Sequence, residues 1–199
     1  MRGPTRSERA IITWDVLAWG VAHAATGYLA HRLPEHRLER DGVVLRLRGV
    51  ETSGRWYRER LRIHRWKDLL PEAGALFDGG VSKRRLPATD RAGLETFVRE
   101  TRRAELAHWW AMACGPVFVL WNPPLAGGLL VAYGIGANLP FILVQRYNRA
   151  RLERLLVRTI VTADPVTADP VTANLVTTDH ATPDPMTTDD ATADHGARR

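Results

Sequence analysis

The chain has 199 residues, the length of one domain, and 28 lysine and arginine residues against 22 aspartate and glutamate residues, a net charge of +6. Residues 161–199 hold seven aspartates and two arginines, so residues 1–160 carry +11. The single cysteine excludes an intrachain disulfide and a CxxC site. Since no nucleic-acid-binding signature accompanies the positive charge, we expect membrane lipids, not nucleic acid, as its partners.

The first apolar segment covers residues 10–30 and is long enough to cross a hydrocarbon core of about 30 Å. Asp15 and His23 interrupt it, and we expect them to face the interior of a helix bundle as a satisfied polar pair. Leu33-Pro34 ends the helix, because proline lacks an N–H donor and restricts the residue before it. The run is long for a signal peptide and lacks a clear cleavage pattern, so we expect a retained membrane helix.

Residues 32–103 form a polar middle region with 18 basic and 11 acidic residues. Within it, residues 43–47 alternate apolar and basic side chains, which predicts a short strand or extended edge. Residues 55–70 set tryptophan and leucine among arginines and predict an amphipathic helix. That helix suits either a membrane interface or packing on its own domain. Residues 83–85 are a basic cluster of the solvated or lipid-facing kind.

A further long helix is predicted to begin near Arg91, with Thr89-Asp90 available as its cap. It becomes apolar over residues 107–121 and stops at Asn122-Pro123-Pro124, a strong turn signal. Residues 125–145 form the last apolar run, so the two runs predict a membrane hairpin. The fold class expected is therefore mainly α: a small integral-membrane protein of about three membrane helices, multi-pass in the cell membrane.

The distribution of charge divides the chain into a membrane domain and a tail. Positive charge gathers in the middle region and after Val144, which favours the cytoplasmic side for both and places the N terminus outside. Residues 161–199 repeat Val-Thr-Ala-Asp-Pro without any aromatic residue and predict a disordered tail, dispensable for the chemistry. Residues 1–160 are expected to form one domain.

Candidate chemistry lies in residues 100–108, Glu-Thr-Arg-Arg-Ala-Glu-Leu-Ala-His, where a polar helix enters an apolar segment. Glu105 lies one helical turn before His108, so its carboxylate could orient the imidazole as a general base. Such a base would deprotonate a hydroxyl that attacks an acyl donor. Arg102 and Arg103 are placed to hold a phosphate or to pair with Glu100. A salt-bridge network at the helix entry, with His108 hydrogen-bonded at the interface, remains the alternative.

Three other motifs are weaker. Glu105-x-x-His108 is half of a carboxylate-bridged di-metal motif whose second copy is missing, so we expect no metal site. His36 and Asp41 match the His-x4-Asp spacing of glycerolipid acyltransferases, but the supporting blocks of that family are absent. Cys114 lies in an apolar run, where a thiol keeps a high pKa, and is expected to be a packing residue.

Two long blocks of the sequence resemble the glycosyl-4,4'-diaponeurosporenoate acyltransferase family. They read Glu100-Thr101-x-Arg103-Ala104-Glu105-Leu106-x-His108-Trp109 and Ala137-Asn138-x-Pro140-x4-Gln145-Arg146-Tyr147-Asn148-Arg149-x-Arg151-Leu152. Arg65-Trp66-Lys67 and Leu33-Pro34 resemble it too, and the likeness covers residues 14–158. The resemblance implies a membrane acyltransferase of carotenoid biosynthesis. That family esterifies a sugar hydroxyl of a glycosylated carotenoid acid with a fatty acyl group, the last step towards staphyloxanthin.

These observations together predict an acyltransferase in which His108 is the base and Glu105 orients it. Arginines are expected to hold a charged head group, and amides to bind the sugar. The substrate-binding residues expected are Glu100, Arg103, Asn138, Gln145, Arg146, Asn148, Arg149, Trp66 and Lys67. We expect a lipid-like glycosylated acceptor, no bound cofactor, and a fatty acyl donor such as acyl-CoA as co-substrate.

Two functions from other classes compete with this hypothesis. One is a non-catalytic membrane module whose basic face binds anionic lipid or a partner biosynthetic enzyme. It predicts that His108→Ala and Glu105→Ala leave function intact, whereas neutralising Arg146 and Arg149 abolishes it. The other is a metal-dependent membrane oxidoreductase, which predicts iron or zinc in the purified protein.

Overall fold

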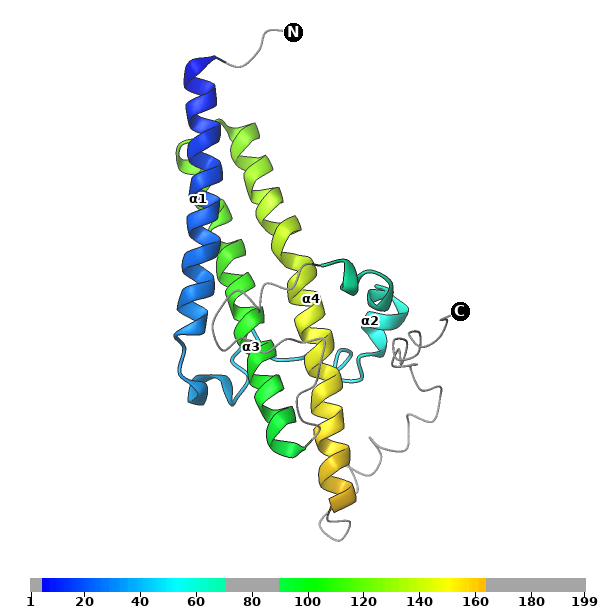
Figure 1. The fold of residues 1–199 in the computed structure, drawn as a ribbon. Helices are drawn as coiled ribbons and strands as arrows, with labels where there is room; N and C mark the ends of the chain where they lie inside the picture. The colour runs from blue at the N-terminus through cyan, green and yellow to red at the C-terminus, as the bar shows by residue number, and fades with distance from the viewer. Residues whose placement is uncertain (1–4, 71–89, 164–199) are drawn as a thin grey trace, which may run out of the picture.

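The computed structural model describes residues 5–70 and 90–163, and over these ranges the protein is helical without a strand. Three long helices lie side by side: α1 (Arg6–His31), α3 (Arg91–Ala113) and α4 (Pro124–Ala163) (Figure 1). The short helix α2 (Arg55–Glu59) lies on the flank of α4. The mainly α fold class is thus confirmed. The basic cluster at 83–85 and residues 164–199 of the repeat tail lie outside the described residues.

Helix α1 is closed at both ends by side chains, which explains its sharp boundaries. At its start, the Thr5 side chain accepts from the backbone N–H of Glu8, and the Glu8 carboxylate accepts from the Thr5 N–H. At its end, Arg103 of α3 donates to the carbonyls of Ala30, His31 and Leu33 at 2.8–2.9 Å. A cation there satisfies the last carbonyls and complements the helix dipole. The segment predicted over 10–30 lies inside α1.

Helix α3 begins as predicted and ends earlier than predicted. The Asp90 side chain accepts from the Gly93 N–H at 3.0 Å and so caps the helix that starts at Arg91. The apolar helix expected over 107–121 is divided, because α3 stops at Ala113 and a 3-10 helix, η5 (Gly115–Leu120), follows. Pro116 has no N–H to continue the α-helical pattern.

Helix α4 is one 40-residue helix that contains Pro140 and extends well beyond the predicted run at 125–145. It packs antiparallel to α3 in a hairpin (Figure 1). Of the residues described, Pro124–Ile160 alone is both long and apolar enough to cross a membrane. Three membrane helices were expected, and by length and apolar composition α4 alone of the described helices meets that expectation.

The polar middle region differs most from its prediction. Residues 43–47 form a turn and loop, although Leu45 and Leu47 are buried and Arg46 is exposed, as in a strand. The helix predicted over 55–70 is broken into α2 and the 3-10 turns η2 (Ile63–Arg65) and η3 (Lys67–Leu69). Arg62 adopts a left-handed conformation, φ 47°, which ends the helical path.

Trp19 of α1 packs that helix against η5 and α4. Its ring lies where Gly115 and Gly134 have no side chain, and a Cβ on Gly134 would come within 2.6 Å of it. The ring also stacks on Phe118 of η5 at 4.7 Å and meets Tyr133 of α4 edge-on at 5.2 Å. Glycine therefore serves here by permitting close helix approach.

Candidate active site

A buried ionic network surrounds Glu105, which is fully inaccessible to solvent. One carboxylate oxygen accepts from Arg146 at 2.7 Å and from the Trp109 indole at 3.2 Å. The other lies 2.8 Å from Arg149 Nη1, an ion pair by distance that lacks the alignment of a hydrogen bond. Glu105 of α3 therefore holds two arginines of α4, and a buried charge needs such partners.

The same two arginines bind the loop before α2. Arg146 forms a two-pronged pair with Glu51, at 3.1 and 2.7 Å, and donates to the carbonyls of Val44 and Arg46. Arg149 donates to the carbonyl of Leu45. The carbonyls of the strand-like segment thus meet guanidinium groups in place of a neighbouring strand. These bonds satisfy the carbonyls of Val44, Leu45 and Arg46, which explains how the segment forms a turn and loop here without a sheet.

The pKa values of this network favour charged groups at neutral pH. Burial alone would raise the pKa of Glu51, but hydrogen bonds from Arg146, Tyr57 and the Arg48 backbone outweigh it and lower the value to about 2. The Arg146 guanidinium, which also donates to Glu105, lies directly against this carboxylate. The pair between α4 and the loop is therefore ionised over the whole physiological range.

A second ionic cluster lies beside the first. Arg102 donates to Asp41 at 2.7 Å and to Glu153 at 3.2 Å. Arg103, the cap of α1, also pairs with Glu100 at 3.1 Å. The expected head-group ligands Glu100, Arg103, Arg146 and Arg149 all have partners within the protein.

A polar chain crosses the bundle at the level of His108, with one residue from each long helix. His108 Nδ1 of α3 lies 3.0 Å from Asn138 Oδ1 of α4, and Asn138 Nδ2 lies 3.5 Å from His23 Nε2 of α1. His23 Nδ1 is 2.9 Å from the carbonyl of Trp19, and Asn138 Nδ2 also donates to the carbonyl of Gly134 at 2.9 Å. The His108 ring stacks on Phe141 at 4.7 Å. We call His23, Asn138 and His108 the relay.

His108 and Glu105, which the sequence analysis paired with each other, have different partners in the structure. Asn138 is the partner of His108 Nδ1, whereas the two oxygens of Glu105 face Arg146 and Arg149. That His108 acts as a base and that Glu105 orients it stay predictions. The alternative of a salt-bridge network describes Glu105 well, and that of a hydrogen-bonded histidine describes His108.

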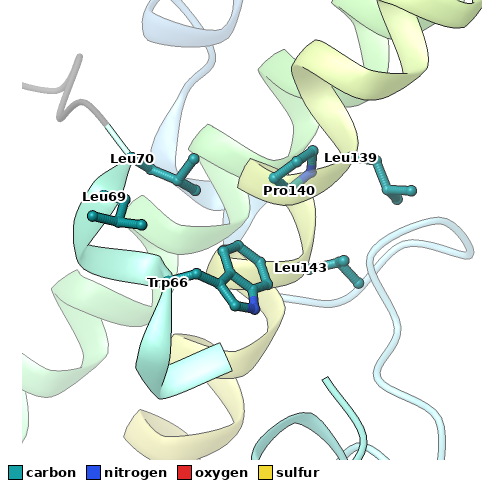
Figure 2. Close-up of a pocket in the computed structure, with 6 residues that line it drawn as sticks. All are labelled: Trp66, Leu69, Leu70, Leu139, Pro140 and Leu143. Carbon is teal, nitrogen blue, oxygen red and sulfur yellow. The ribbon is translucent and has the colours of Figure 1, made fainter. Parts of the chain in front are cut away.

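The remaining predicted ligands lie on α4 and in the η2–η3 segment. Gln145 is buried and Asn148 half-buried. Trp66 lines an apolar groove of about 360 Å³ between η3 and α4, with Leu69, Leu70, Leu139, Pro140 and Leu143 (Figure 2). Its indole donates to the Leu61 carbonyl, and the neighbouring Lys67 pairs with Asp68. At about 100° per residue, the groove side chains of α4 lie roughly 100–200° around the helix from Asn138.

Sequence reasoning missed Glu51 and Tyr57 as members of the networks, and it assigned no site role to His23; it named Arg102, but with Glu100 in place of its partners Asp41 and Glu153. Tyr57 donates to Glu51 at 2.6 Å. The partners of Glu51 and His23 are 95 and 115 positions away, so no local spacing reveals them. Tyr57 is six positions from its partner Glu51. For His23 there was one usable signal: an ionisable residue inside an apolar helix marks a site by default. Among the described residues, no group of histidine, cysteine and carboxylate side chains could hold a metal ion.

Comparison with known proteins gives one consistent result. A sequence model of the glycosyl-4,4'-diaponeurosporenoate acyltransferases matches residues 41–158. The protein of that name from Staphylococcus haemolyticus is 32% identical over 148 residues, which cover 70% of this chain and 86% of the relative. That of Staphylococcus aureus strain USA300 is 28% identical over 139 residues, covering 69% of this chain and 83% of the relative. No solved structure matches.

Proposed function

The chain belongs to the glycosyl-4,4'-diaponeurosporenoate acyltransferase family, and from this we propose that it esterifies a sugar hydroxyl of a glycosylated carotenoid, or a similar glycolipid, with a fatty acyl chain. The observation that carries the proposal is the extent of the family match. Residues 41–158 include the Glu105 network together with Asn138 and His108. Because the relatives are covered over more than four fifths of their length, the comparison concerns the whole protein.

We propose His108 as the general base. Its Nε2 takes the proton of the sugar hydroxyl, and the hydroxyl oxygen attacks the carbonyl carbon of a fatty acyl thioester, for which acyl-CoA is the expected donor. The new C–O bond forms and the C–S bond breaks. The proton on the imidazolium passes to the departing thiolate, so the products are an ester and a free thiol. Glu105, in this account, keeps the helices and loop in place around the base.

We further propose that all three long helices lie in the membrane. Large apolar side chains are exposed along the same stretch of the bundle: Ile11, Ile12, Val16, Leu17 and Val21 of α1, Val117, Val119 and Leu120 of η5, and Leu125, Leu129 and Ile135 of α4. So wide an exposed apolar surface fits lipid better than water. Asp15, the carboxylate within this stretch, is buried and accepts from Trp121 and Asn122 at 2.9 and 3.0 Å.

The position of His108 suits an acceptor held by the bilayer. Asn138, its partner, lies eight residues before Arg146, about 12 Å along α4 at 1.5 Å per residue. The imidazole is therefore placed just inside the polar boundary marked by the ionic network. An acceptor whose apolar part stays in lipid would bring its sugar to this level.

For the donor, we propose the face formed by α2, η2 and η3. Residues 55–67 carry six basic side chains, of which Arg55, Arg60, Arg62 and Arg65 are exposed, which favours an anionic carrier such as coenzyme A. The groove beside Trp66 has a wholly apolar lining and a volume within the range of ligand pockets, so it suits an apolar tail. Trp66 and Lys67 remain substrate contacts in this proposal.

A direct assay tests the proposed function. Membranes from cells that express the protein are incubated with a fatty acyl-CoA and glycosyl-4,4'-diaponeurosporenoate, and the extracted lipids are analysed by mass spectrometry. We expect a product heavier by one acyl group, and none in membranes without the protein. The carotenoid acid without its sugar is the matched control and stays unmodified. Acylation of that control, or no acylation of the glycoside, would contradict the proposal.

A further inference from the structure

We infer that His23 is a positioning residue: acting through Asn138, it holds His108 in the tautomer that a base requires. The inference rests on the proposed function, since it concerns the same imidazole. It adds a residue on α1 that lies outside the matched range of residues 41–158.

The direction of every hydrogen bond in the relay follows from its one unambiguous end. The carbonyl of Trp19 can only accept, so His23 Nδ1 carries a hydrogen. A neutral His23 then has its lone pair on Nε2, which accepts from the Nδ2 of Asn138. The same Nδ2 group gives its second hydrogen to the carbonyl of Gly134, another pure acceptor.

These two acceptors decide the orientation of the Asn138 amide. With both hydrogens of Nδ2 committed, the oxygen of the amide must face His108 Nδ1, 3.0 Å away. An amide oxygen only accepts, so Nδ1 of His108 carries the hydrogen and the lone pair lies on Nε2. Nε2 is the atom proposed to take the proton of the sugar hydroxyl.

The relay does not move protons. When His108 Nε2 becomes protonated, Nδ1 keeps its hydrogen and its bond to Asn138, so no bond in the relay changes partner. The oxygen of the buried Asn138 amide faces the new imidazolium charge on the half-buried His108 and stabilises it. Without His23, the Nδ2 group of Asn138 would lose one acceptor, and the reversed amide, which fixes the other tautomer of His108, would become more accessible.

Packing fixes the position of His23 independently of the relay. Trp19, whose carbonyl receives the His23 hydrogen, is the residue inserted between Gly115 and Gly134. The Trp19 and His23 rings also touch, with centroids 5.3 Å apart. The side chain that locks α1 to α4 is therefore one turn from the side chain that reaches Asn138.

Kinetics of three α1 variants test the inference. We expect His23→Leu to lower kcat at least roughly 10-fold, towards the roughly 10²-fold typical of lost base catalysis, with little change in KM. His23→Gln keeps an acceptor for Asn138 and a donor for Trp19, and should remain within a few-fold of the wild type. Thr26→Val is the control, because the buried Thr26 hydroxyl bonds only to carbonyls of its own helix, and it should leave kcat unchanged.

A spectroscopic measurement separates positioning from loss of fold. In protein with ¹⁵N-labelled histidine, the wild type should show His108 with a protonated Nδ1 and an unprotonated Nε2, and a folded His23→Leu protein should show a mixture. Wild-type kcat and a single tautomer in His23→Leu would overturn the inference, as would a folded but inactive His23→Gln. If His108→Ala is fully active, the proposed base itself fails. If His108→Ala is inactive and the His23 variants are fully active, the proposed base is supported and the positioning role of His23 is overturned.

Discussion

At the scale of single residues, Glu51 makes stability depend on acid pH. Its folded pKa of about 2 lies below the ordinary value of 4.5, so its contribution is complete above that value and disappears as pH falls towards 2. We expect the unfolding temperature in detergent to drop over this window, and the drop to be smaller in Glu51→Gln. Glu59→Gln is the control, since Glu59 forms an exposed pair with Arg55 and should change little.

Neutralising Arg146 should also act mainly on stability. The guanidinium is buried against Glu105 and Glu51, and removal of one partner leaves buried charge, which typically costs about 3–5 kcal/mol. We expect Arg146→Gln to lower the free energy of unfolding by roughly this amount in denaturant titrations, and the exposed Arg65→Gln to leave it nearly unchanged. Equal stability of the two variants would contradict the network.

The burial of Arg146 and Arg149 changes how the rival function, a non-catalytic module that binds anionic lipid, has to be tested. That rival predicts loss of function when Arg146 and Arg149 are neutralised, but loss of fold gives the same result. Exposed arginines such as Arg60 and Arg65 are the residues whose replacement tests anionic lipid binding, because the structure places them at the surface.

At the scale of helices, the contact between α1 and α4 depends on one glycine. A Cβ on Gly134 would lie 2.6 Å from the Trp19 ring, so Gly134→Ala must displace that ring or the helix. We expect a lower melting temperature and, because His23 follows Trp19 by one turn, a lower kcat. Gly136→Ala, on the same helix with open space around it, should be neutral or stabilise by about 0.5–1 kcal/mol. Equal effects of the two substitutions would refute the packing.

At this scale the sequence predicts the features that depend on residues close together in the chain, such as helix starts, turns and apolar segments. The Asp90 cap, the turn at Pro123 and the apolar runs are local signals, and the structure has helices where they predict them. The α2 region could not be predicted in this way. Its apolar spacing is helical, but Arg62 turns the chain so that Ile63 can be buried against α4.

The candidate site was predictable in several of its members and not in its pairings. Asn138, His108, Glu105 and Arg146 were all named from the sequence. Glu105 was paired with His108 because they are one turn apart, whereas the structure pairs Glu105 with Arg146, 41 positions away. Spacing along one helix shows which residues share a face. It does not show which charged residue of another helix packs against that face.

At the scale of the whole molecule, the proposal of three membrane helices places the N terminus and the polar middle region on opposite sides. Single cysteines introduced at Ser7 and Thr52 in a Cys114→Ser background report this with a membrane-impermeant thiol reagent. We expect labelling of intact cells at position 7, and at position 52 only after the membrane is broken. Labelling of both in intact cells, or of neither before lysis, would contradict the arrangement.

The central claim is that this family member transfers an acyl chain with His108 as base. The most direct measurement is the rate of ester formation on the glycosylated carotenoid by purified His108→Ala, beside Cys114→Ala as a control that is likewise half-buried. We expect loss of roughly 10²–10⁴-fold in kcat for His108→Ala, with KM and melting temperature little changed, and wild-type rates for the control. Ester formation at the wild-type rate by a folded His108→Ala protein would contradict the account.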